Sequence, residues 1–271
     1  MSYSAFLLRF LMPPLILLAV MYVRDTRRAK NLPPELRGQP AWVVLLGLVI
    51  VALIYTTPWD NYLVATQVWW YDPSRVVGLT LGWVPVEEYG FFILQTLMTG
   101  LWWVWLARHL PLMEPDGLHR SSWWWKPLAV GAAVWLAAVA VLSMGWKPGT
   151  YLALEFAWAL PPIMLQLAFG ADILWHYRWL VGLTILIPTL YLSVADSTAI
   201  GVGTWTFSPE KSSGWWVGGV LPVEEWFFFL LTNILIGFGM TLVMALESQK
   251  RFRGLIEWAY SERKVKGKSN V

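Results

Sequence analysis

The sequence predicts an all-α polytopic membrane protein: a helix bundle of seven transmembrane helices, built from two parallel three-helix repeats joined by a linking helix. Of the 271 residues, 57% are hydrophobic and only 14% are charged, and the mean hydropathy is +0.52. These values exclude an ordinary soluble surface. Seven apolar stretches are each about long enough to cross a bilayer. One unusual acidic motif also occurs twice, which indicates duplication.

We expect the seven spans at residues 4–23, 41–57, 86–107, 124–143, 150–170, 177–195 and 218–246. The first stretch has the position of a signal peptide, but Arg9 interrupts it and Pro13-Pro14 lies in its middle. We therefore expect it to remain as a mature span. Many of the 21 Trp residues lie at the ends of these stretches, where indole rings favour the membrane interface.

The distribution of positive charge predicts the orientation. Sixteen of the 20 Lys and Arg residues lie in the loops and tail of one side, whereas Arg75, Lys147 and Lys211 lie on the other. Because cytoplasmic loops are rich in Lys and Arg, we expect an integral protein of the cell (cytoplasmic) membrane with its N-terminus outside and its C-terminus in the cytoplasm. The basic tail fits contact with anionic membrane lipid, and nothing indicates a nucleic-acid partner.

The repeated motif reads VPVEEYGFFILQT from Val84 to Thr96 and LPVEEWFFFLLT from Leu221 to Thr232. In each copy the proline can begin a helix, and two glutamates fall in its first turn, where acids complement the helix dipole. Capping needs one acid, whereas each copy has two, about 100° apart around the helix. One acid of each pair can therefore cap the helix while the other faces the bundle.

We expect Glu88 and Glu225 to face a pocket, with Glu87 and Glu224 as their partners or as caps. Two phenylalanines follow each pair at helical spacing and should form an aromatic wall beside the carboxyl groups. These are Phe91 and Phe92 in the first copy and Phe228 and Phe229 in the second. Neighbouring carboxyls in a low-dielectric pocket cannot all ionise, so the pocket should offer both a general acid and a general base.

Three further acids lie in or beside the spans. Asp60 and Asp196 precede the two motifs at matching distances, and we expect them to support the substrate pocket or cap span ends. Glu155 has no counterpart in the first repeat, where Leu7 takes its place, so it is our candidate for an asymmetric catalytic or proton-relay residue. An acid at mid-bilayer costs roughly 2.5 to 3.5 kcal/mol, so acids kept there indicate function.

The duplication extends beyond the motif. Tyr3 stands ten residues before Pro13-Pro14, and Tyr151 stands ten before Pro161-Pro162, and we expect these groups to serve kinks and packing. We place the first repeat at residues 1–110, the linking span at 111–149, the second repeat at 150–246 and a basic cytoplasmic tail at 247–271. An odd linking span returns the second repeat in the same orientation, so both glutamate pairs should face each other at one depth.

Other chemistries find little support in the sequence. The chain has no Cys, no G-x-G-x-x-G fingerprint, and three His residues without metal-ligand spacing. We therefore predict a site with no metal and no cofactor.

The P-V-E-E-x-x-F-F pair at 85–92 and 222–229, the duplicated three-span plan and the Trp/Pro loop before each motif resemble the small membrane lycopene cyclases. The resemblance covers nearly the whole chain. It implies an isomerase of carotenoid biosynthesis that converts the ψ end groups of membrane-dissolved lycopene into β-ionone rings by acid and base catalysis through a carbocation. It is also compatible with a homo-oligomer or with association with other carotenoid enzymes.

Two alternatives stay open from the sequence. One is a related enzyme, either a carotenoid hydratase or a cyclase of longer carotenoids that forms ε or γ rings. The other is a proton-coupled membrane transporter built from two repeats. The phenylalanines beside each glutamate pair and the parallel, rather than inverted, repeats favour the enzyme.

Overall fold

A computed structural model of the chain describes residues 1–112 and 125–268, with side chains up to residue 257. The helices are α1 (Tyr3–Phe6), the π-helical turn η1 (Leu7–Leu11), α2 (Met12–Arg27), the short turn η2 (Pro34–Leu36), α3 (Ala41–Ala65), α4 (Val86–His109), α5 (Trp125–Met144), the short turn η3 (Lys147–Gly149), α6 (Thr150–His176), α7 (Arg178–Gly201), α8 (Val223–Met244) and α9 (Leu246–Lys268). The strands are β1 (Trp69–Tyr71), β2 (Thr80–Leu81), β3 (Val84–Pro85), β4 (Trp205–Phe207), β5 (Trp216–Val217) and β6 (Leu221–Pro222).

The predicted all-α membrane fold is confirmed. Within the described ranges, seven helical segments are long and apolar enough to cross a membrane, and each coincides with one predicted span. The last span begins at Val223 rather than at residue 218, because the residues before it form β5 and β6. The predicted start of the fourth span, residue 124, lies outside the described residues.

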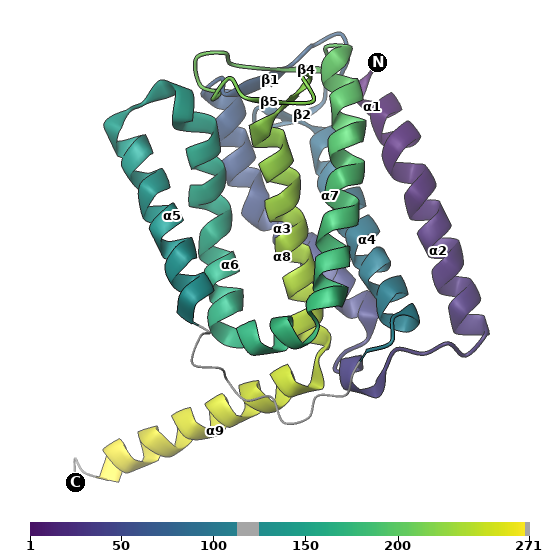
Figure 1. The fold of residues 1–271 in the computed structure, drawn as a ribbon, viewed down its shortest axis with the longest axis vertical. Coiled ribbons are helices and arrows are strands. Elements are labelled where there is room, and N and C mark those ends of the chain that lie inside the picture. Colours follow the sequence, from purple (N-terminus) through teal and green to yellow (C-terminus); the bar gives the residue numbers. More distant parts are fainter. Residues whose placement is uncertain (113–124, 269–271) are drawn as a thin grey trace.

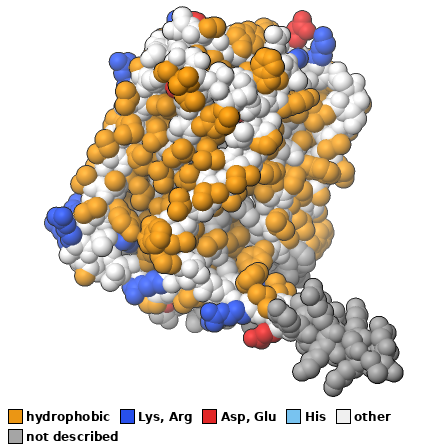
Figure 2. Space-filling model, turned by 180° about the vertical axis from the view of Figure 1, so that it is seen from behind, with side chains coloured by type: hydrophobic (Ala, Val, Ile, Leu, Met, Phe, Trp, Pro, Cys, Tyr) orange, Lys and Arg blue, Asp and Glu red, His pale blue; other side chains and the backbone are white. Residues whose placement is uncertain are grey.

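The long helices stand side by side, with the strands at the end of the bundle that carries the N-terminus and α9 at the opposite end (Figure 1). Helices α4 and α8 are the most buried of the seven segments, whereas α5 lies at the edge and packs on α6. Hydrophobic side chains cover the middle of the face in Figure 2, and Lys and Arg gather towards its two ends. This is the surface that a membrane-spanning bundle requires.

Short strands connect and close the end of the bundle that carries the glutamates. Strand β1 pairs with β4 in antiparallel register, with Trp69 opposite Phe207 and Tyr71 opposite Trp205. Strands β2 and β3 form a hairpin before α4, and β5 and β6 form the matching hairpin before α8. Apolar periodicity does not predict these strands, because most are only two residues long.

Matched backbone contacts support the proposed division into two repeats. The amide of Tyr3 donates to the carbonyl of Arg75 at 2.7 Å, and the amide of Tyr151 donates to the carbonyl of Lys211 at 2.9 Å. Each contact ties the start of one repeat to the loop that precedes its own glutamate motif.

Helix α9 occupies most of the predicted basic tail. Arg251 donates to both carboxylate oxygens of Asp172 near the end of α6, at 2.9 and 2.6 Å. The same side chain donates to the carbonyl of Phe169 at 2.6 Å. A bidentate pair of this kind holds the start of α9 against the bundle.

Polar side chains join α4 to α8 along the centre of the bundle. The hydrogen bonds run from Gln95 to Thr232 (2.8 Å), from Thr99 to Asn233 (2.7 Å) and from Trp103 to Thr241 (2.9 Å). Asn233 also donates to Thr189 on α7 at 3.1 Å. Because hydrocarbon cannot satisfy polar groups, these bonds fix the two motif-bearing helices in one register.

We expect Asn233→Leu to destabilise the bundle, because it removes both bonds of the Asn233 amide. Each interhelical bond in a membrane contributes about 0.6 to 1.7 kcal/mol, so the loss should be of that order or about twice it. Reversible unfolding in mixed micelles would measure it. Val194→Ala, at a position 70% exposed on α7, is the control. Equal stability of the two variants would contradict the role given to Asn233.

Candidate active site

Both glutamate motifs begin at a hairpin that sets the start of the next helix. Strands β3 and β6 end at a proline, and the following valine begins α4 or α8. The amide of Val86 donates to the carbonyl of Leu79 at 2.9 Å, and the amide of Val223 donates to that of Trp215 at 3.0 Å. We predicted each proline at the first helical position; it lies at the N-cap instead, because it still belongs to the hairpin. Both glutamates of each motif lie in the first helical turn.

The first glutamate of each motif fastens the loop that precedes it. Glu87 Oε1 accepts a hydrogen bond from the backbone amide of Val77, and Glu224 Oε1 accepts one from that of Ser213, each at 2.6 Å. Both side chains are buried. The structure therefore places Glu87 and Glu224 as matching loop anchors, directly beside the second glutamate of each motif.

The second glutamates, Glu88 and Glu225, line the same cavity. Its volume is about 40 Å³, and the two residues are only 7% and 5% exposed. Glu88 comes from α4 and Glu225 from α8, so one buried space receives a carboxyl group from each proposed repeat. This is the arrangement expected from parallel repeats that present their motifs at one depth.

Three tyrosines hold these two carboxyl groups. Tyr3 and Tyr71 both donate to Glu88 Oε2, at 2.6 and 2.8 Å. Tyr151 donates to Glu225 Oε1. We predicted only kinks and packing for Tyr3 and Tyr151, and the structure shows that both also donate a hydrogen bond to a glutamate. Their matched positions in the two repeats are the sequence feature that could have indicated this role. We did not include Tyr71 in the predicted site, because a single tyrosine in a loop between spans has no spacing that links it to the glutamates.

The Tyr71 phenol lies on β1, outside the spans, and is a dependable donor. Burial raises its pKa well above the usual value, and the negative charges of Asp60 and Glu88 raise it further. The hydroxyl group therefore keeps its proton at all physiological pH values.

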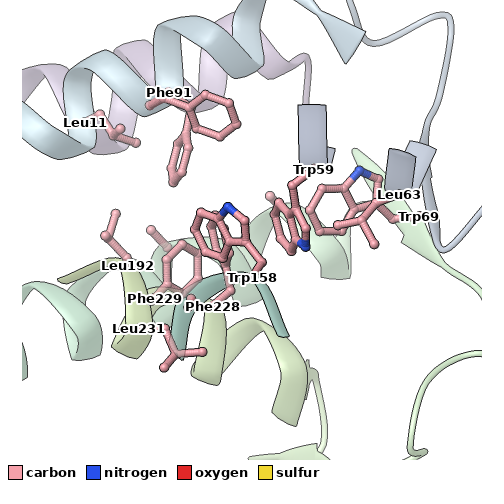
Figure 3. Close-up of a cluster of buried hydrophobic side chains, with 14 of the residues drawn as sticks. Leu11, Trp59, Leu63, Trp69, Phe91, Trp158, Leu192, Phe228, Phe229 and Leu231 are labelled. Atoms are coloured by element: carbon pink, nitrogen blue, oxygen red, sulfur yellow. The ribbon is translucent and has the colours of Figure 1, made fainter. Parts of the chain in front are cut away.

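Aromatic rings form most of the remaining wall. Phe91 from α4 points towards Phe228 and Phe229 from α8 (Figure 3), and the Phe91 and Phe229 ring centroids lie 6.2 Å apart. Phe228 stacks on Trp59 with centroids 6.0 Å apart and ring planes 5° apart. Other rings at the cavity are those of Tyr3, Phe6, Trp69, Tyr71, Trp205 and Phe207. Three of the four predicted phenylalanines thus line the cavity.

The fourth predicted phenylalanine, Phe92, lines a second cavity deeper in the bundle. This cavity has a volume of about 180 Å³ and lies between α3, α4, α6 and α8. Phe228 lines both cavities, so it stands between them. Val51 and Tyr55 also line the second cavity and are 59% and 40% exposed on the outer face of α3. The second cavity therefore extends from the motif helices towards the surface that faces lipid.

The three further acids are fully or almost fully buried. Asp196 lines the first cavity, whereas Asp60 and Glu155 do not. No hydrogen bond from the described part of the chain reaches either carboxyl oxygen of Asp60 or of Glu155. Glu155 lies one helical turn after Tyr151 on α6, next to the ring that holds Glu225. In the described part of the chain, no three His, Asp or Glu side chains are grouped to hold a metal ion.

The fold and the cavity define an integral membrane protein that holds a pair of acids within an aromatic pocket. A sequence model of one family, described as lycopene cyclase, matches residues 3–106 and 148–243. The chain belongs to the lycopene cyclase family, which confirms the resemblance noted in its motifs.

The chain is also similar to individual proteins that are described as lycopene cyclases. A lycopene beta-cyclase of Halobacterium salinarum is 40% identical over 246 residues, which cover 89% of this chain and 95% of that protein. A bifunctional lycopene cyclase/phytoene synthase of Leptosphaeria maculans is 35% identical over 258 residues, covering 88% of this chain and 40% of the fungal protein. The protein of the same description from Podospora anserina is 36% identical over 204 residues, or 72% of this chain and 34% of its own. No solved structure matches the chain.

Proposed function

We propose that this chain is a lycopene β-cyclase of carotenoid biosynthesis, which converts the ψ end groups of lycopene into β-ionone rings without net oxidation or reduction. The observation that carries the proposal is the pair of buried carboxyl groups, Glu88 and Glu225, in one aromatic cavity. The extensive match to the lycopene beta-cyclase of H. salinarum supports the same activity.

Ring closure needs an acid, a base and a site that excludes water. A carboxylic acid gives a proton to C2 of the terminal alkene, which leaves a cation at C1. The C5=C6 electron pair then closes the bond between C6 and C1, and a carboxylate removes the C6 proton to restore the C5=C6 double bond. Atoms and electrons balance as an isomerisation. Glu88 and Glu225 together supply the acid and the base in this proposal.

The aromatic wall suits the cationic intermediate. A cation over the face of a Phe, Tyr or Trp ring gains about 0.5 to 2 kcal/mol when water is excluded. Phe91, Phe228 and Phe229 offer such faces beside the carboxyl groups. The same rings exclude the water that would trap the cation as an alcohol.

The second cavity offers a path for the polyene chain. Lycopene is apolar and dissolves in the membrane, so it would approach through the lipid-facing side of α3, where Val51 and Tyr55 line this cavity. Phe228 separates this space from the glutamates, and a movement of its ring would join the two cavities. The end group could then reach the acids while the chain stays in the apolar space.

We place the glutamates towards the non-cytoplasmic face of the cell membrane. The strand-capped end of the bundle carries Arg75, Lys147 and Lys211, whereas the end that carries α9 holds most of the positive charge. The positive-inside rule therefore puts α9 in the cytoplasm.

Expression in cells that accumulate lycopene tests the function directly. The expected product has the mass of lycopene and absorbs at shorter wavelength, because each ring closure consumes an isolated terminal double bond and twists the C5=C6 double bond out of the plane of the polyene. A product heavier by one water would indicate a hydratase, and a ring with its double bond at another position would indicate an ε- or γ-cyclase. Unchanged pigment together with proton flux in vesicles would indicate the transporter.

A further inference from the structure

The two carboxyl groups of the site are held differently, although their surroundings match in shape. In the first repeat the ring of Tyr3 stacks on that of Tyr71, with centroids 6.0 Å apart and planes 19° apart. In the second repeat the ring of Tyr151 stacks on that of Phe207, with centroids 5.9 Å apart and planes 18° apart. The loops WWYDP and WTFSP align Tyr71 with Phe207. One hydroxyl group is therefore the difference between two otherwise equivalent ring pairs.

That hydroxyl group changes the chemistry of the glutamate it meets. Glu88 Oε2 accepts from two phenols, those of Tyr3 and Tyr71, whereas among the side chains that the structure describes only the phenol of Tyr151 donates to Glu225. Hydrogen bonds donated to a carboxylate favour its charged form. The first repeat therefore favours a carboxylate at Glu88 more strongly than the second favours one at Glu225.

A second difference acts in the same direction. Glu155 lies four residues after Tyr151 on α6 and is completely buried, and Leu7 occupies the equivalent position in the first repeat. A further acid beside the phenol that holds Glu225 disfavours a second negative charge there. In the first repeat the apolar side chain of Leu7 lies at this position, so no additional acid there disfavours a negative charge on Glu88.

The other acids around the pair act on both halves. Asp60 on α3 interacts electrostatically with both Glu88 and Glu225, and so does Asp196 on α7. Glu87 and Glu224 are matching neighbours on α4 and α8, each bound to a loop amide. Glu87 differs from Glu224 in one respect, since it also accepts a hydrogen bond from the hydroxyl of Ser4 at 3.3 Å. At Glu88 and Glu225 themselves, the groups that distinguish the two repeats are Tyr71 and Glu155.

We propose that Glu88 is the catalytic base and Glu225 the catalytic acid, and that Tyr71 is the positioning residue that fixes this order. The assignment rests on the proposed cyclase function. In each ring closure, Glu225 gives its proton to C2 of the terminal alkene and becomes a carboxylate. The carboxylate of Glu88 then accepts the proton from C6, whose bonding pair becomes the new C5=C6 double bond. One proton must return from Glu88 to Glu225 before the next closure, and both groups line the same cavity.

The variants Tyr71→Phe and Phe207→Tyr test the order, because each exchanges only one hydroxyl group. Cyclisation rates are measured against pH in liposomes that contain lycopene, with folding checked by size exclusion in detergent. Tyr71→Phe removes one hydrogen bond that stabilises the charged form of Glu88. The base is then protonated at higher pH, so the acidic limb of the rate profile should move to higher pH by about one to two units. Phe207→Tyr gives Glu225 a second donor, so the alkaline limb should move to lower pH. Movement of the opposite limb in either variant, or no movement in both, would overturn the proposal.

Infrared difference spectra of Glu225→Gln and Glu88→Gln, each against wild type, give a readout that needs no turnover. Glu225→Gln should remove a carbonyl band of a protonated carboxylic acid, and Glu88→Gln should remove a carboxylate band. The reverse pattern overturns the order. Wild-type conversion of lycopene is measured in parallel: if the wild type forms no ring, the proposed function fails, whereas ring formation with the reverse spectra rejects only the order.

Discussion

Replacing Glu88 or Glu225 by Gln should each lower the rate of ring closure by roughly 10²- to 10⁴-fold, the range that one positioned acid or base contributes. Glutamine keeps the size of the side chain but can neither give up an acidic proton nor accept one as a carboxylate. Both residues are buried beside the same cavity, so solvent cannot easily replace them. Pigment extracted from lycopene-accumulating cells, normalised to the amount of folded protein in the membrane, measures the loss.

Glu87→Gln and Glu224→Gln are matched controls for these variants. Each lies one residue away on the same helix and accepts a loop amide through one oxygen, a bond that the carbonyl of glutamine can still accept. We expect these variants to retain most of their activity. Normal cyclisation by both Glu88→Gln and Glu225→Gln would remove the acid and base roles from the cavity pair.

The sequence was sufficient to predict the helices and the pair of pocket acids. Hydropathy reports long apolar helices directly, because lipid demands them. The duplicated motif supplied the rest: two adjacent acids about 100° apart cannot both have the same environment on one helix. The structure follows that division, with Glu87 and Glu224 tied to loops and Glu88 and Glu225 at the cavity.

One sequence was not sufficient to predict which side chains surround those acids. Tyr71 reaches Glu88 from a loop, through a β1 strand that pairs with β4 of the other repeat. Such pairing between distant short segments has no periodic signal. Likewise Phe92 shares the spacing of the cavity phenylalanines, but its ring lines the deeper cavity. The packing of the bundle decides which face of a buried helix meets a cavity. A helix that is apolar on all sides has no sequence pattern that marks this face.

Phe228→Leu should slow ring closure by roughly 2- to 30-fold and should give a hydroxylated by-product. Phe228 lines both cavities and stacks on Trp59, so its loss removes one aromatic face from the cation and opens the separation between the glutamates and the deeper space. Removing a cation–π contact of about 0.5 to 2 kcal/mol accounts for the rate, and water admitted to the cation accounts for the alcohol. Mass analysis of the carotenoids measures both effects.

Phe227→Leu is the matched control, because Phe227 packs on Phe156 with centroids 5.2 Å apart and lines neither cavity. The same rate and the same products from these two neighbouring variants would show that the ring of Phe228 neither stabilises the cation nor keeps water away from it.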